Sequence, residues 1–101
     1  MKAIIDGMRF DTGAATEVAR DSWGYANDFE HFTEGLYRTE RGAWFLAGEG
    51  GAMSKYARPV SGGGTGGGEK IIPLTAEDAR NWLERNDETE AIEQHFEIDD
   101  A

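Results

Sequence analysis

Cysteine is absent from this sequence, and proline occurs only twice. A chain without cysteine forms no disulfide, and it has no thiolate to serve as a nucleophile or as a zinc ligand. Small secreted domains usually depend on disulfides, so we expect a protein of a reducing cytoplasm. Long apolar runs are missing too. None approaches the roughly 20 residues of a membrane span, and the N-terminal run Ala3-Ile4-Ile5 is too short for a signal peptide.

Basic residues are scarce toward the C-terminus. Residues 1–60 hold nine acids against seven bases, a net charge of −2, and residues 61–101 hold eleven against three, a net charge of −8, which together give the total of −10. Residues 86–101 contain seven acids and neither lysine nor arginine. Charge segregated in this way creates a directed field that favours basic partners. It argues against direct binding to nucleic acid or to an anionic membrane surface.

The length of 101 residues predicts a single domain, residues 1–101. Only 39% of the residues are hydrophobic, but aromatic side chains add buried area and make a core feasible. The sequence divides into a β-rich part (1–60), a glycine-rich loop (61–68) and an edge strand followed by an acidic helical end (69–101).

The first segment predicts a tight hairpin. Asp6-Gly7 suits a type I′ turn, whose two central residues need positive φ, and this turn pairs Ile5 with Met8. Residues 11–20 fit either one helical turn or a weak strand, and we favour a third strand. Residues 21–32 are rich in aromatic side chains without a regular period, so we expect an irregular segment there.

A second hairpin is predicted over residues 36–46. The segment Glu40-Arg41-Gly42 fits a three-residue loop that ends in a left-handed glycine. In that register Tyr37 and Phe45 share one face of the sheet, whereas Leu36 and Leu46 share the other. A two-residue turn would mix the two faces, so we prefer the longer loop.

The glycine-rich loop contains six glycines in eight residues, a composition typical of a mobile segment. It does not fit a phosphate-binding loop, because Glu69-Lys70 and a strand follow it instead of Gly-Lys-Ser/Thr and a helix. The strand over residues 69–74 should lie at a sheet edge, because Pro73 has no N–H to donate.

Two helices are predicted after this strand. Thr75 is a suitable N-cap with Asp78 three residues later, and an inward apolar stripe follows at helical spacing: Ala79, Trp82 and Leu83. Asn86-Asp87 should end this helix, and a second short one is predicted over residues 88–96. The fold class is therefore α+β: an antiparallel β meander of four to six strands, built from hairpins, with one or two C-terminal α-helices packed on one face.

The sequence offers no recognisable catalytic pattern. His31 and His95 are far apart and lack carboxylates at metal-ligand spacing. Ser54 adjoins Lys55, but neighbours on an extended segment point to opposite sides. We therefore expect no catalytic residue, no metal, no cofactor and no enzymatic activity.

Several stretches carry a resemblance that covers most of the chain: Met1–Gly7, Leu36–Thr39, Gly42–Leu46, Gly48–Gly51, Ser54–Ala57 and Ile71–Thr75. In these the chain resembles small acidic proteins of unassigned role carried by bacterial phages and mobile elements. In size, acidity and lack of cysteine it is also similar in type to anti-CRISPR proteins. That resemblance implies a non-enzymatic inhibitor of a bacterial nucleic-acid-handling defence complex, acting in the cytoplasm of the host cell.

CRISPR effectors hold nucleic acid in positively charged channels, so we expect the partner to be the basic surface of such a protein or ribonucleoprotein complex. An acidic surface that occupies the channel would be the route of inhibition. Its predicted contact residues are Glu77, Asp78, Glu84, Asp87, Glu88, Glu90, Glu93, Glu97, Asp99 and Asp100.

An alternative is a protein interaction module of a mobile element that binds through an aromatic and glycine-rich surface, because Trp and Tyr are frequent interface anchors. That surface would consist of Trp23, Tyr25, Trp44, Glu49, Lys55 and Tyr56. A small enzyme is a third and weaker alternative. Pairing of two chains through an exposed strand edge stays open as well.

Overall fold

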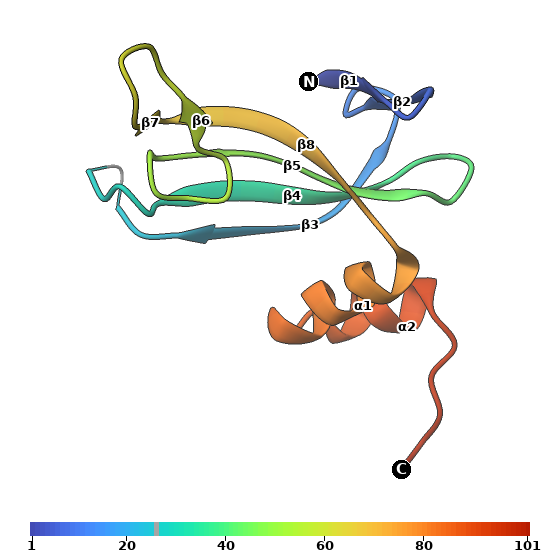
Figure 1. Ribbon diagram of the computed structural model, residues 1–101. Coiled ribbons are helices and arrows are strands. Elements are labelled where there is room, and N and C mark those ends of the chain that lie inside the picture. Colours follow the sequence, from blue (N-terminus) through green and yellow to red (C-terminus); the bar gives the residue numbers. More distant parts are fainter. Residues whose placement is uncertain (26) are drawn as a thin grey trace.

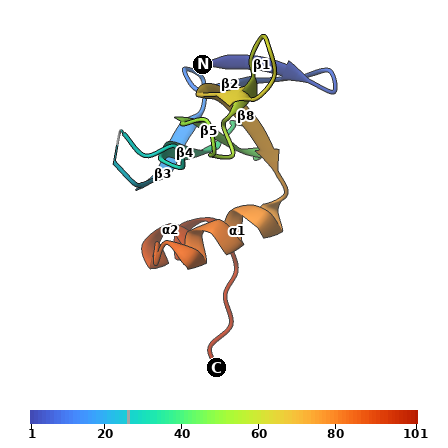
Figure 2. The ribbon, with the colours of Figure 1, turned by 60° about the vertical axis from the view of Figure 1, so that its left-hand side comes forward.

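The computed structural model describes residues 1–25 and 27–101, and these form an α+β fold of three layers. A hairpin lies on one face of a four-stranded antiparallel sheet, and two helices lie on the other (Figure 1). The same layers are visible after rotation (Figure 2). The hairpin consists of β1 (Lys2–Ile5) and β2 (Met8–Asp11). The sheet has the order β3 (Thr16–Trp23), β4 (Phe32–Arg38), β5 (Trp44–Gly50), β8 (Gly68–Leu74).

The β1–β2 hairpin has the predicted turn and register. Asp6 and Gly7 have φ values of 52° and 77°, and Ile5 pairs with Met8. The hairpin buries Phe10 against Phe45, with the ring centroids 5.4 Å apart in an edge-to-face arrangement. This contact forms the smaller of two cores, on the side of the sheet away from the helices.

The β4–β5 hairpin also confirms its predicted register. Leu36 pairs with Leu46 and Tyr37 with Phe45, while Gly42 has a φ of 89° in the three-residue loop. Tyr37 and Phe45 stack on the side of the β1–β2 hairpin, with centroids 5.2 Å apart. Leu36 and Leu46 belong to the larger core under the helices. The loop length therefore determines which side chains enter which core.

The third strand exists but is longer than predicted. β3 runs from Thr16 through Trp23, so residues 21–23 are regular, and Phe32 already begins β4. The prediction of an irregular segment over 21–32 was wrong at both ends. Pairing with β4 extends the strand, because each ladder bond satisfies backbone groups regardless of the weak local propensity.

The glycine-rich segment is partly ordered. β6 (Arg58–Pro59) and β7 (Thr65–Gly66) form a small antiparallel ladder, so the predicted loop 61–68 is the turn and return strand of a short hairpin. β8 begins at Gly68 and occupies an edge of the main sheet, where Pro73 was predicted to place it.

The helices are α1 (Ala76–Arg85) and α2 (Thr89–His95). The Thr75 hydroxyl accepts a hydrogen bond from the Asp78 N–H at 3.1 Å, which confirms the N-cap. The predicted stripe is buried in the larger core: Ala79, Trp82 and Leu83. Asp87 has a φ of 54° between the helices, and Phe96 follows α2 and stacks on Trp44. Neither helix of the described chain has the length and apolar character needed to span a membrane.

Candidate functional site

Acidic side chains line the outward side of the helices and of the segment that follows them. All are exposed except Glu88, which is half-buried: Glu77, Asp78, Glu84, Asp87, Glu88, Glu90, Glu93, Glu97, Asp99 and Asp100. The inward side of α1 is apolar, so the amphipathic pattern turns the carboxylates of that helix toward solvent. We call this set of ten residues the acidic layer.

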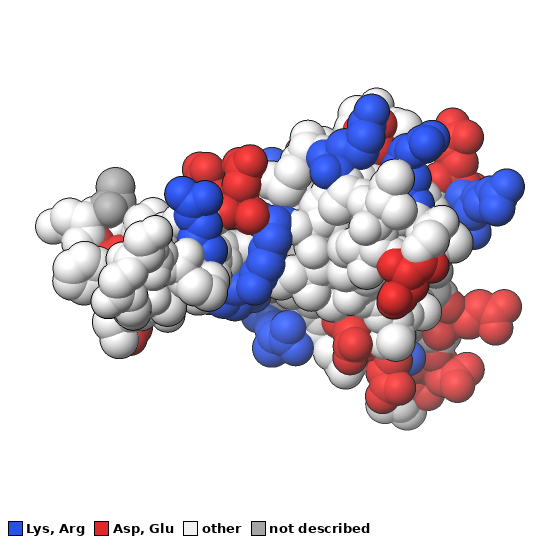
Figure 3. Space-filling view, turned by 45° about the horizontal axis from the view of Figure 1, so that its top comes forward, with Lys and Arg blue, Asp and Glu red and all other residues white. Residues whose placement is uncertain are grey.

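The acidic layer is almost uncompensated. Residues 75–101 hold ten acids against two arginines, a net charge of −8. In the part of the chain that the structure describes, the layer contains one ion pair, between Arg80 Nε and Glu84 Oε2 at 3.4 Å. Acidic side chains gather at the lower right of Figure 3, toward the helices and the C-terminus. The opposite end of the molecule is mostly uncharged on the face shown.

Only some of these acids have a structural explanation. Three lie in the first turn of a helix, where the helix dipole favours negative charge: Glu77, Asp78 and Glu90. Among the described residues, six others form neither an ion pair nor a side-chain hydrogen bond: Asp87, Glu88, Glu93, Glu97, Asp99 and Asp100. Mutual repulsion of these carboxylates opposes folding, so folding alone gives no reason for them.

The residues of the alternative surface are not brought together. Trp44 is buried beneath α2, and Tyr56 is buried against the centre of the sheet. Lys55 reaches inward to Glu34, while Glu49 stands exposed near the end of β5. Trp23 and Tyr25 alone share an exposed location, where β3 ends.

Trp23 and Tyr25 belong to a different exposed cluster, which we call the aromatic tip: Trp23, Tyr25, Phe29 and Met53. Their exposed fractions are 53%, 80%, 69% and 66%. Phe29 comes from the β3–β4 loop, and Met53 from the loop after β5. The Met53 N–H donates to the Phe29 carbonyl at 2.8 Å, which holds the two loops together. Met53 could not be predicted from a local pattern, because this contact joins loops far apart in the chain.

A buried carboxylate, not expected from the sequence, lies between the sheet and α1. Glu34 on β4 is 1% exposed and accepts hydrogen bonds from Tyr56 Oη at 2.7 Å and Trp82 Nε1 at 2.8 Å. Lys55 Nζ lies 2.9 Å from Glu34 Oε1 and neutralises the charge. Burial, the hydrogen bond to Glu34 and the charge of that carboxylate raise the pKa of Tyr56 well above its ordinary value.

This cluster positions α1, which carries three acids of the layer, Glu77, Asp78 and Glu84. Glu34 joins β4 to α1 through Trp82 and to the loop after β5 through Lys55 and Tyr56. The carboxylate is fully enclosed, so it is not available to a substrate. A fully satisfied polar network of this kind fixes one arrangement of the elements around it.

The second helix is fixed by a similar contact. Arg38 Nη1 donates to His95 Nδ1 at 3.0 Å, and the guanidinium lies over the Trp44 ring at 5.2 Å. Burial, followed by the positive charge of Arg38, lowers the pKa of His95. The neutral imidazole is therefore the form that fits the folded chain.

Ser54 and Lys55 do not act on each other. The Ser54 hydroxyl donates to the Gly51 carbonyl at 2.8 Å and accepts from the Tyr56 N–H, so it stabilises a turn. Lys55 is engaged with Glu34. Over residues 1–25 and 27–101, no group of three or more His, Asp or Glu side chains is arranged to hold a metal ion.

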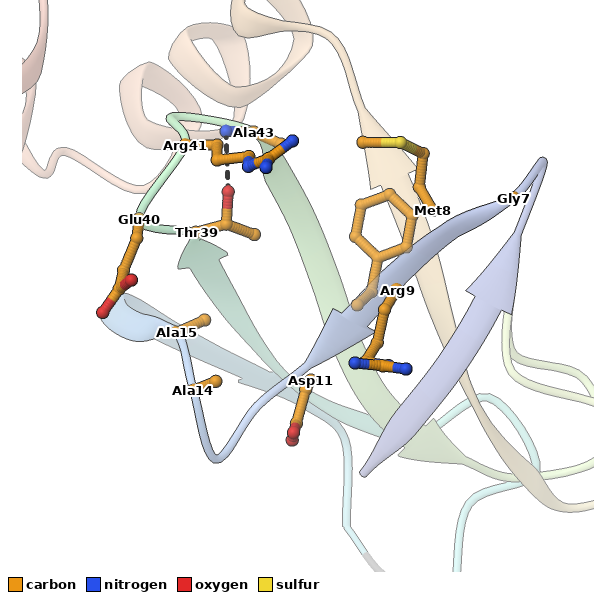
Figure 4. Close-up of a pocket in the computed structure, with 11 residues that line it drawn as sticks. Gly7, Met8, Arg9, Asp11, Ala14, Ala15, Thr39, Glu40, Arg41 and Ala43 are labelled. Carbon is orange, nitrogen blue, oxygen red and sulfur yellow. Dashed lines mark hydrogen bonds between the residues drawn. The ribbon is translucent and has the colours of Figure 1, made fainter.

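A hollow of about 530 Å³ lies between the β1–β2 hairpin and the β4–β5 loop (Figure 4). Alanines and Phe10 line part of this hollow. Its charged lining residues are two arginines and two acids: Arg9, Arg41, Asp11 and Glu40. At the edge of the hollow, the Thr39 hydroxyl accepts a hydrogen bond from the Ala43 N–H. These four charges sum to zero, so the lining favours neither an anion nor a cation. We assign no ligand to it.

Comparison with known proteins gives no family, since no family model, no curated protein and no solved structure matches this chain. The acidic layer and the aromatic tip are therefore judged on their own geometry.

Proposed function

We propose that this protein is a non-enzymatic inhibitor that binds the basic nucleic-acid channel of a bacterial defence complex, a CRISPR effector, through its acidic layer. It would act in the bacterial cytoplasm, where such complexes work. The observation that carries the proposal is the uncompensated charge of −8 over residues 75–101. Carboxylates placed where phosphates normally bind would compete with nucleic acid for the channel.

The fixed packing of α1 and α2 on the sheet supports this function. Trp82 is hydrogen-bonded to Glu34 in the sheet, and Phe96 stacks on Trp44 at a centroid distance of 5.4 Å. The carboxylates on α1 and α2 are therefore displayed on fixed helices. Preorganised groups lose less conformational entropy on binding than groups on a disordered tail.

The acidic layer is favoured over the alternative aromatic and glycine-rich surface because Trp44 and Tyr56 belong to the interior. A partner could reach these two side chains only after the chain had unfolded around them. The acids of the layer, in contrast, are accessible in the folded protein.

The test compares two variants with the same net charge. The layer variant carries Glu93→Lys, Glu97→Lys and Asp99→Lys. The control variant carries Glu40→Lys, Glu49→Lys and Glu69→Lys, at exposed positions of the sheet and its loops. Each substitution adds two charges, so both variants change from −10 to −4. A shortened chain is less suitable, because truncation after Asn86 would remove Ala91 and Phe96 from the core.

The measurement is the inhibition of target-DNA binding by a set of purified CRISPR effectors loaded with guide RNA. We expect the wild type and the control variant to inhibit at least one effector, and the layer variant to lose most of that activity. Inhibition should also weaken steeply with added salt. Equal loss in both variants would mean that net charge alone matters, and full activity of the layer variant would place the contact elsewhere.

A further inference from the structure

The aromatic tip borders an open hollow whose lining has a definite chemistry. Its volume is about 330 Å³, at the lower end of the roughly 300–1,000 Å³ of ligand pockets. It is lined by three apolar side chains and two carboxylates: Trp23, Phe29, Met53, Asp28 and Glu30. The tip lies at the end of the molecule that is mostly uncharged in Figure 3. Such a small, open hollow suits one inserted side chain better than a whole metabolite.

Hydrogen bonds hold the tip in its open shape. The Tyr25 N–H donates to Asp28 Oδ2 at 2.9 Å, and the Asp28 N–H donates to the Tyr25 carbonyl at 2.9 Å. The His31 ring lies with Nδ1 2.6 Å from the Asp28 carbonyl, which can only accept, so this nitrogen donates. These bonds therefore fix the backbone of Tyr25, Asp28 and His31 beside the exposed aromatic side chains.

The charge of the lining selects the occupant. Asp28 and Glu30 give the hollow two negative charges, and within the described chain Glu30 forms no ion pair or side-chain hydrogen bond. An apolar segment would leave these carboxylates without water or a partner, and a phosphate would be repelled. A cation attracted to the faces of Trp23 and Phe29 satisfies both parts of the lining.

We propose that the aromatic tip is a binding site for an arginine side chain of a partner protein. The planar guanidinium would stack on Trp23 or Phe29 and form a salt bridge with Glu30. Arginine fits better than lysine, because its flat, weakly hydrated group stacks on rings and donates two parallel hydrogen bonds to a carboxylate. This site goes beyond the proposed function, because it shares no residue with the acidic layer.

The test uses a blocked Gly-Arg-Gly peptide and the same peptide with citrulline, which has nearly the same shape but no charge. Nuclear magnetic resonance follows the three indole N–H signals of the folded full-length protein. Trp23 is exposed, whereas Trp44 and Trp82 are buried and serve as internal references. We expect the arginine peptide to shift the Trp23 signal in a saturable way, and the citrulline peptide to bind about tenfold more weakly.

Two variants and a control locate the site. Glu30→Gln and Phe29→Ala should each weaken the arginine peptide about fivefold to tenfold. Glu49→Gln, at an exposed acid outside the hollow, should leave its affinity unchanged. All three changes are at exposed side chains, and an unchanged thermal midpoint would verify that each variant is folded.

Equal binding of the two peptides would overturn the arginine site, as would wild-type affinity in both tip variants. A Trp23 shift produced by phosphatidylcholine vesicles or by oligothymidine, but not by the arginine peptide, would identify a membrane-binding or base-stacking tip and would overturn it too. These results are independent of the charge-reversal experiment, in which no tip residue is changed.

Discussion

Replacing Tyr56 with phenylalanine removes one donor from the enclosed carboxylate of Glu34 and changes little else. The hydroxyl donates to Glu34 Oε1 at 2.7 Å, and both side chains are almost completely buried. Water cannot take the place of the lost donor at such a site. Trp82 and Lys55 remain as the other donors, so the carboxylate keeps part of its stabilisation.

The expected loss follows from these contacts. A hydrogen bond to a charged group contributes about 1.5–3 kcal/mol, and an unsatisfied buried acceptor adds to the cost of losing it. We therefore expect Tyr56→Phe to lower the free energy of unfolding by about 2 kcal/mol. A domain of this size is stable by about 5–15 kcal/mol, so the variant should still fold. Its thermal midpoint should fall by roughly 8–16 °C.

Urea and thermal unfolding, followed by far-ultraviolet circular dichroism, measure this loss. Tyr25→Phe is the matched control, because its hydroxyl belongs to a side chain that is 80% exposed. The control should change the free energy of unfolding by less than about 0.5 kcal/mol. If Tyr56→Phe changed stability as little as the control, Glu34 would not hold β4, α1 and the loop after β5 together.

Three further changes test other parts of the fold. Glu69→Lys should raise the free energy of unfolding by about 0.5 kcal/mol, because Glu69 lies directly opposite Glu49 in the β5–β8 ladder; a lower thermal midpoint would contradict this. Gly48→Ala should destabilise by about 2–3 kcal/mol in urea unfolding, because a Cβ there would lie 2.6 Å from Tyr56 Cζ; wild-type stability would refute the close packing. The unfolded chain protonates His95 more readily than the folded chain does, since folding lowers the pKa of His95. Stability should therefore fall as the pH drops below about 6.5, and His95→Asn should reduce that fall. An equal fall between pH 7.5 and 5.5 in wild type and variant would exclude His95 as its source.

Elements with a local signal could be predicted from the sequence. Asp6-Gly7 specifies its own turn type, and the turn then fixes the register of the first hairpin. Thr75 caps α1 through its own side chain, and Gly42 closes the β4–β5 loop with a left-handed φ. In each case the deciding interaction lies within a few residues of the signal.

Features that depend on distant contacts could not be predicted. Residues 21–23 are strand because β4 pairs with them, although their own pattern is irregular. The alternating pattern of its strand predicts that Glu34 is a surface acid. Its burial is compensated by hydrogen bonds from Tyr56 and Trp82, which are distant in the sequence. Met53 joins the aromatic tip through a backbone bond between two loops. The exposure of the acids on α1 and α2 could be predicted, because amphipathic spacing alone determines which side of a helix is exposed.

Hydrogen–deuterium exchange of the protein, alone and bound to the proposed defence-complex partner, tests the acidic layer most directly. We predict that residues 76–95 exchange more slowly in the complex, because the partner covers the outward side of both helices. Unchanged exchange throughout residues 76–100, with slower exchange confined to other segments, would contradict the proposal that the acidic layer is the contact surface.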